Sequence, residues 1–186
     1  MQALGQDFDF KQERLLWGHL DNRPFLRAYH GYGLQLLKRN GKKQARDIFE
    51  NILATNPNDN QGIRCILPAL FFGVNKPDRV IGISDRFPDD AMPETVYGRV
   101  LALVQLDRVL EAEVVLARAV ASLPLAAHEL LKERHIKPQS AFPGTVTLGG
   151  PDQAYEYWSD YGKYWRKTPK ALELLRAALY ARKKAH

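Results

Sequence analysis

One spacing of residue types occurs twice in this chain and limits the folds that it can adopt. A small residue is followed by a large apolar residue four positions later and by a proline eight positions after that. The spacing occurs at Ala45, Phe49 and Pro57 and again, 67 residues further on, at Ala112, Leu116 and Pro124. A displacement of 67 is close to two periods of about 34 residues, which is typical of stacked helix-turn-helix units. The sequence therefore predicts an array of α-helical hairpins.

Helical periodicity supports a hairpin around the first copy of this spacing. Apolar and aromatic residues form one face over residues 24–39, and the helical period returns over residues 42–56. Between them, Gly41 is expected to end the first helix in the left-handed conformation. Gly33 lies twelve residues before Ala45, where two closely packed helices need a small residue. Two helices joined by so short a turn should pack antiparallel.

The polar segment 56–64, with the sequence NPNDNQGIR, is predicted to join two hairpins. Pro57 follows the second helix and disfavours its continuation. Either Asn58 or Asp59 can accept hydrogen bonds from the free amides of a third helix that begins near Asn60. The end of one helix followed directly by the start of the next explains most of the composition of this segment.

The predicted fold class is all-α. It is a right-handed superhelical array of antiparallel hairpins of the tetratricopeptide type, with three to four degenerate units and extra helices at both ends. Residues 93–124 are interpreted as two amphipathic helices around Asp107, and Pro68 should bend the helix that contains it. The predicted parts of this single 1–186 domain are an N-terminal helix (1–22), repeat units (23–57, 58–90 and 91–124), a short helix and loop (125–150) and a helix pair (151–186).

Three motifs give the chain a resemblance to a known family. Residues 56–64 follow the first hairpin, residues 150–157 place a Gly-acidic-Ala-Tyr pattern on a helix, and residues 165–172 read WRKTPKAL. Over residues 23–176 the chain resembles bacterial tetratricopeptide proteins related to the suppressor-of-tumorigenicity-seven family, although Lys170 stands where that pattern has glycine. The resemblance implies a helical repeat scaffold with no established catalytic residues.

The composition excludes several function classes at the level of sequence. The single cysteine, Cys65, cannot form an internal disulfide, and the five histidines are not spaced as metal ligands. No glycine-rich phosphate loop and no nucleophile elbow is present. The longest apolar run, residues 66–74, is too short to span a membrane, and no secretory leader is seen at the N-terminus. We therefore expect a cytoplasmic protein that is not an enzyme and needs no cofactor or metal.

Binding of another protein is the function that the pattern favours. In superhelical arrays the first helices of successive units line a concave surface. A mildly basic groove with one aromatic residue suits an acidic peptide or a terminal carboxylate, so the chain is predicted to be a scaffold or adaptor. Arg64 either binds this partner or has a structural role, pairing with Asp59 or with a neighbouring unit. The predicted groove residues are Arg27, His30, Lys38, Gln61, Arg64 and Tyr97.

Nucleic-acid binding is the alternative. The chain has a formal net charge of +6 and a pI near 9.4. The predicted helix over residues 154–166 carries aromatic side chains beside Lys163 and Arg166, a combination that can stack and hold a single strand. Packing of these aromatic residues in the core is the favoured interpretation. The basic runs at 38–46, 131–137, 164–170 and 180–186 are read as solvated surface, because cations complement the C-terminal end of a helix.

Overall fold

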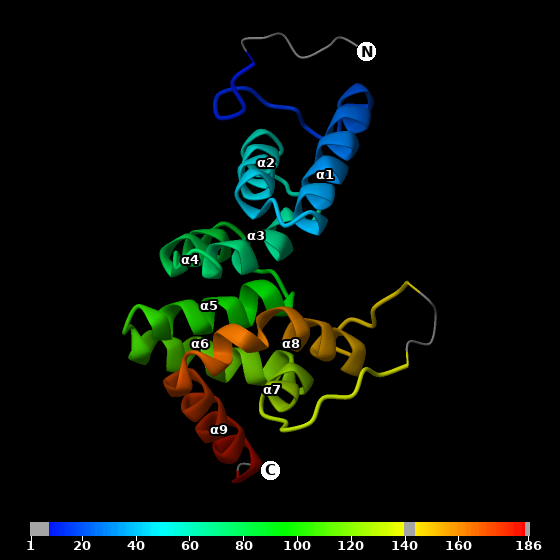
Figure 1. The fold of residues 1–186 in the computed structure, drawn as a ribbon. Coiled ribbons are helices and arrows are strands. Elements are labelled where there is room, and N and C mark those ends of the chain that lie inside the picture. The colour runs from blue at the N-terminus through cyan, green and yellow to red at the C-terminus, as the bar shows by residue number, and fades with distance from the viewer. Residues whose placement is uncertain (1–7, 140–143, 185–186) are drawn as a thin grey trace. The chain divides into compact units, whose positions relative to one another are not determined.

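The computed structural model describes residues 8–139 and 144–184, and in these residues it contains α-helices and one short 3-10 helix but no strand (Figure 1). The all-α prediction is therefore confirmed. Contacts divide the chain into two compact units, residues 1–70 and 71–186. The α-helices are α1 (Arg23–Lys38), α2 (Lys42–Thr55), α3 (Ile63–Phe72), α4 (Pro77–Arg86), α5 (Pro93–Gln105), α6 (Val109–Ser122), α7 (Pro124–Leu130), α8 (Pro151–Arg166) and α9 (Pro169–Lys184).

Helices α1 and α2 form the core of the N-terminal unit. Leu26, Ala45 and Phe49 are completely buried between them. A Cβ atom on Gly33 would lie 2.8 Å from the ring of Phe49, closer than packed carbon atoms approach. The small residue that the sequence places here is thus required by the contact of the two helices.

The N-terminal segment differs from the prediction of a helix over residues 1–22. Its described part forms turns and a 3-10 helix, η1 (Leu20–Asn22). The amide of Leu15 donates to Thr55 Oγ1 at 3.0 Å, and the amide of Trp17 donates to Asn56 Oδ1 at 3.2 Å. The Thr55 hydroxyl donates in turn to the carbonyl of Glu13. Backbone amides that would form hydrogen bonds within a helix instead donate to side chains at the end of α2.

Three helix ends share one turn conformation. Asn40, Asn75 and Asp107 have φ values of 62°, 56° and 57°, and each lies two residues before the next helix. The amide after each of them donates to a carbonyl five residues earlier, as in a Schellman motif. These bonds are Gly41 to Leu36 (2.8 Å), Lys76 to Phe71 (3.0 Å) and Arg108 to Leu103 (2.9 Å). Gly41 was expected to be the left-handed residue. This prediction is wrong, because the φ of Gly41 is −78° and Asn40 has the left-handed conformation.

The joint before α3 is capped by Asp59. Its carboxylate accepts the amides of Ile63 at 2.7 Å and Arg64 at 3.0 Å, and it also binds the Arg64 guanidinium. The predicted cap is thereby resolved in favour of Asp59, and α3 begins at Ile63 rather than near Asn60. Pro68 lies inside α3, as predicted.

The C-terminal unit is built from α4 to α9. Neighbours along the chain pack together, and α8 and α9 also return to contact α5. Tyr97, Tyr157 and Trp165 form an aromatic core and are at most 1% exposed. Their polar atoms are satisfied, because Tyr97 donates to the carbonyl of Leu123 at 2.8 Å and Trp165 Nε1 donates to the Tyr157 hydroxyl at 3.0 Å. Across the described residues no helix is both long and apolar enough to cross a bilayer.

Candidate functional site

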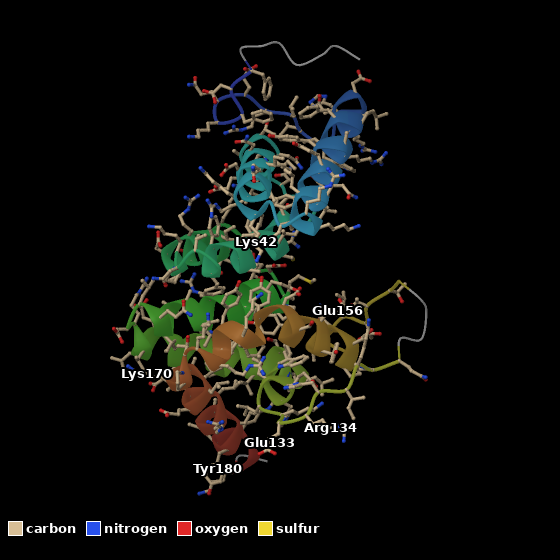
Figure 2. The ribbon with its side chains drawn as sticks, in the orientation of Figure 1. Lys42, Glu133, Arg134, Glu156, Lys170 and Tyr180 are labelled. Atoms are coloured by element: carbon tan, nitrogen blue, oxygen red, sulfur yellow. The ribbon has the colours of Figure 1, made fainter. Side chains whose placement is uncertain are left out.

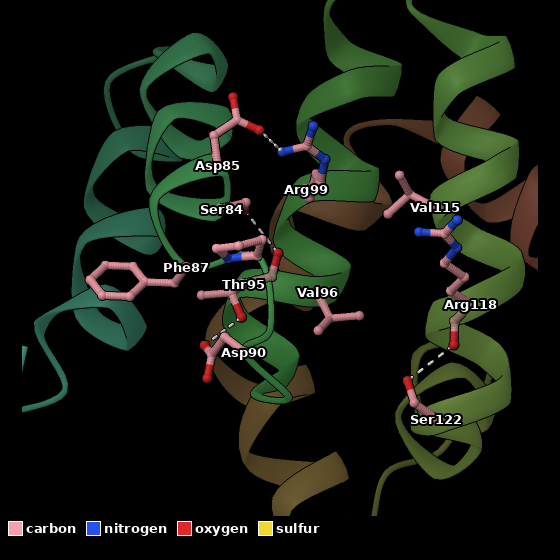
Figure 3. Close-up of a pocket in the computed structure, with 11 residues that line it drawn as sticks. Ser84, Asp85, Phe87, Asp90, Thr95, Val96, Arg99, Val115, Arg118 and Ser122 are labelled. Carbon is pink, nitrogen blue, oxygen red and sulfur yellow. Dashed lines mark hydrogen bonds and ion pairs between the residues drawn. The ribbon is translucent and has the colours of Figure 1, made fainter. Parts of the chain in front are cut away.

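A pocket of about 440 Å³ lies on the C-terminal unit, bounded by α4, α5, α6 and the turn between α4 and α5 (Figure 3). Val96 of α5 and Val115 of α6 point into the space between their helices. The turn contributes Phe87 and Pro88. The volume is within the usual range for sites that hold a small ligand or a few side chains of a peptide.

Hydrogen bonds fix the polar wall of the pocket. Ser84 Oγ donates to the carbonyl of Thr95 at 3.1 Å, and the Thr95 hydroxyl donates to Asp90 at 2.7 Å. Arg99 of α5 forms an ion pair with Asp85 of α4. These bonds tie α4, its following turn and α5 together, so this wall is positioned before any ligand arrives.

Arg118 of α6 provides a cation at the opposite wall. It forms no ion pair with any residue that the structure describes, and its guanidinium lies near Val115 (Figure 3). Helix α6 was expected to be simply amphipathic, but Leu110 and Val114 are 79% and 60% exposed. Leu110 and Val114 lie one helical turn apart, and Arg118 lies one turn further along α6. We call Leu110 and Val114 the apolar strip of α6; this exposed apolar pair was the sequence signal for the site.

The predicted groove residues of the N-terminal unit have different environments. Arg27 is exposed, with its guanidinium 5.3 Å from the centre of the Trp17 ring, and Lys38 is exposed at the end of α1. Arg64 pairs with Asp59 at 3.0 Å, and the Asp59 side chain is completely buried. Of the two roles left open for Arg64, the structure supports pairing with Asp59.

His30 and Gln61 lie partly inside the N-terminal unit. Gln61 Nε2 donates to the carbonyl of Leu26 at 3.0 Å, while Gln61 Oε1 and His30 Nε2 are buried without a hydrogen-bond partner among the described residues. Burial lowers the pKa of His30, and the charge of Asp59 partly opposes this shift. A neutral imidazole is therefore favoured, so His30 adds little positive charge to the surface.

Tyr97, the sixth predicted groove residue, is completely buried. Its hydroxyl is used in the bond to Leu123, and burial raises the pKa of Tyr97 well above its ordinary value. The Tyr97 side chain is therefore not accessible to a partner.

Half of the six aromatic residues of α8 belong to the core, and the other half, Tyr155, Trp158 and Tyr164, are half-buried. Tyr157 and Tyr161 are 1% exposed, and Trp165 is completely buried. Trp158 is partly accessible, but the ring of His135 is stacked on it at 3.5 Å between centres. The buried rings and the ring of Trp158 that His135 covers therefore leave mainly Tyr155 and Tyr164 for stacking with a base.

No group of three or more metal-ligating side chains is found within residues 8–139 and 144–184. The strongest perturbation of a carboxyl group is at Glu94, in the first turn of α5. Burial, with smaller contributions from Asp160, Asp90 and Glu156, raises the pKa of Glu94 to about 7. The charges that act on Glu94 are those of other acids, so we interpret its raised pKa as a contribution to the pH dependence of stability.

Comparison with protein-family models gives a match over almost the whole chain. The model of a family described as transcriptional repressor TCF25 matches residues 2–186. No curated protein and no solved structure matches the chain. The match overturns the resemblance to proteins related to the suppressor-of-tumorigenicity-seven family. That resemblance depended on motifs such as residues 56–64, and a helix stop followed by a cap can join hairpins in any helical protein. The chain belongs to the Tcf25 family.

Proposed function

We propose that this chain is a non-catalytic helical scaffold that binds a partner protein, and that it takes part in transcriptional repression by holding that partner. The pocket between α4, α5 and α6 is the observation that carries the proposal. It joins apolar walls to a pre-positioned polar wall, and the exposed apolar strip of α6 extends its surface. Contiguous exposed apolar surface beside a pocket is typical of protein-binding sites.

The scaffold is proposed to be an array of repeated hairpins. The shared turn conformation at Asn40, Asn75 and Asp107 supports this, since it recurs after 35 and then 32 residues. The buried small residues Ala45 and Ala112 support it as well. Repeated hairpins have extended surfaces, and these are commonly used to bind other proteins.

The chemistry of the pocket suggests which part of a partner it holds. Val96 and Val115 fit an apolar side chain, and Arg118 can bind a carboxylate two or three residues away on the same peptide. An apolar residue close to an acidic residue is therefore the proposed ligand. The exposed cation Arg27 is a second proposed contact for an acidic partner, whereas Arg64 is assigned to stabilising α3.

The test is affinity purification of partners from the native source with the whole chain and three variants. We expect Arg118→Glu to lower recovery of the main partner at least tenfold, as loss of a charged contact does in many interfaces. Arg176→Glu, an exposed residue of α9, changes the net charge equally and should leave recovery unchanged. The variant Arg27→Glu tests the second contact. Equal recovery with wild type and Arg118→Glu, both folded by circular dichroism, would refute the pocket as the binding site.

The family also bears on location. A chain that acts in transcriptional repression works in the nucleus or on chromatin, so we propose a nuclear site of action in place of the cytoplasmic one expected from the sequence. Fluorescence microscopy of the tagged chain in its native cells would check this.

A further inference from the structure

A second surface, on the N-terminal unit, has a different chemistry. Lys38 and Arg39 end α1, and Lys42 and Lys43 begin α2, with only Asn40 and Gly41 between the two pairs. We call these four cations the basic turn. All four are exposed, and none forms an ion pair with any residue that the structure describes; Lys42 is labelled in Figure 2.

Helix dipoles account for only half of this charge. Lys38 and Arg39 lie at the C-terminal end of α1, where cations are favourable. Lys42 and Lys43 lie in the first turn of α2, where the helix end is itself positive. That turn has no acidic residue, and Gly41 provides no side-chain cap. The interpretation of the whole run as helix-stabilising charge therefore fails for α2.

The surroundings of the basic turn point to an anion recognised by charge alone. Every exposed residue from 38 to 44 is charged or polar, and the apolar neighbours Leu37 and Ala45 are half-buried and buried. A protein partner normally needs an apolar anchor in addition to charge. Interfaces with nucleic acid are more polar and more positive, and most of their contacts are to phosphate.

We propose that the basic turn binds the phosphate backbone of nucleic acid without reading its sequence. The long side chains of two cations on each side of a two-residue turn can reach successive phosphates of one strand, and the amides at the start of α2 add favourable polarity. This inference is independent of the pocket, which lies on the other unit. It also differs from the aromatic α8 surface considered from the sequence, since no base stacking is required.

The experiment is fluorescence anisotropy with two probes, a labelled DNA duplex of about 20 base pairs and a single-stranded RNA of about 20 nucleotides, each titrated from about 50 to 200 mM salt. Four phosphate contacts predict a slope of log K against log salt of about −3.6 for the duplex and about −2.8 for the single strand. The probe bound more tightly identifies the source of the phosphate. No binding of either probe at the lowest salt would overturn the proposal.

Two variants with equal charge change locate the surface. In the first, Lys38, Arg39, Lys42 and Lys43 are replaced by Gln. We expect at least a tenfold weaker affinity at the lowest salt and loss of most of the slope, which is about 3.6 in magnitude for the duplex and about 2.8 for the single strand. In the matched control the same replacement is made at four exposed cations of the other unit, Arg134, Lys137, Lys167 and Arg176.

The control variant should keep most of the affinity and the slope. Equal loss in the two variants would show binding by net charge alone and overturn the assignment. A labelled poly-glutamate peptide is the competing probe. If it binds the wild-type chain more tightly than both nucleic acids and loses binding in the first variant, the surface serves an acidic protein and the proposal is refuted.

Discussion

Replacing Glu94 with glutamine should remove a pH dependence from the stability of the C-terminal unit. Glu94 Oε2 is buried and has no hydrogen-bond partner among the described residues. Burial, and to a smaller extent the charges of Asp160, Asp90 and Glu156, raises the pKa of this carboxyl from 4.5 to about 7. The protonated acid is therefore the form that the folded protein prefers, and glutamine is close to it in shape.

The sign and size follow from proton linkage. Between pH 4.5 and pH 7 the folded state binds more protons at Glu94 than the unfolded state does, so stability falls as pH rises through this window. The difference between the two pKa values corresponds to an upper limit of about 3 kcal/mol of unfolding free energy, which is lost once pH is above 7. About 2.5 kcal/mol of this loss occurs between pH 5 and pH 8. Glu94→Gln should therefore be more stable than wild type at pH 8 by up to that amount and nearly equal to it at pH 5.

The assay is urea unfolding of wild type and Glu94→Gln at pH 5, 6, 7 and 8, followed by circular dichroism. Glu113→Gln, on the exposed face of α6, is the control and should follow wild type at every pH. Comparing variant with wild type at each pH cancels the contribution of all other titrating groups. A difference between Glu94→Gln and wild type that stays the same from pH 5 to pH 8 would refute the reasoning.

Three further predictions concern the packing and turns of the helices, each measured by chemical unfolding. Gly33→Ala should destabilise the chain by about 1–3 kcal/mol, because the new methyl group meets the Phe49 ring; Gly98→Ala, which has only an ordinary contact at 3.6 Å, should be neutral or mildly stabilising. Asp59→Asn should cost about 2–3 kcal/mol through loss of a buried charge pair at the start of α3, and an unchanged midpoint would contradict its role. Asn75→Ala should cost about 1 kcal/mol at its left-handed turn while Asn75→Gly should not; equal effects would argue against strain there.

The helix pattern could be predicted from the sequence because local signals agree with the fold. Proline occupies one of the first two positions of α1, α4, α5, α7 and α8, where its fixed φ favours the helix and its missing amide costs nothing. The helix predicted at residues 8–19 was wrong, because their apolar spacing suits a helix while hydrogen bonds to Thr55 and Asn56, about 40 residues away, hold them in turns. Local patterns carry no information about such distant partners.

The candidate site could be predicted from the sequence less well than the helices. The pocket joins Ser84, Thr95 and Arg118 from three helices, and no motif links these positions. Tyr97 was placed in the groove because it aligns with the first-helix positions of the other repeat units. Only its packing against Tyr157 and Trp165 shows that it is buried. The four cations of residues 38–43 can be seen in the sequence, but whether each one stabilises its helix depends on which helix end it occupies.

The return of α8 and α9 to α5 has a consequence for the order in which the molecule can form during synthesis. The pairing of α1 with α2 needs only residues that leave the ribosome close together, so the N-terminal unit can begin to fold early. The C-terminal unit cannot complete its core until Trp165 and Leu175 have been made, because both are completely buried there. Until then its apolar surface stays exposed on the growing chain, and chaperones would be expected to act at that stage.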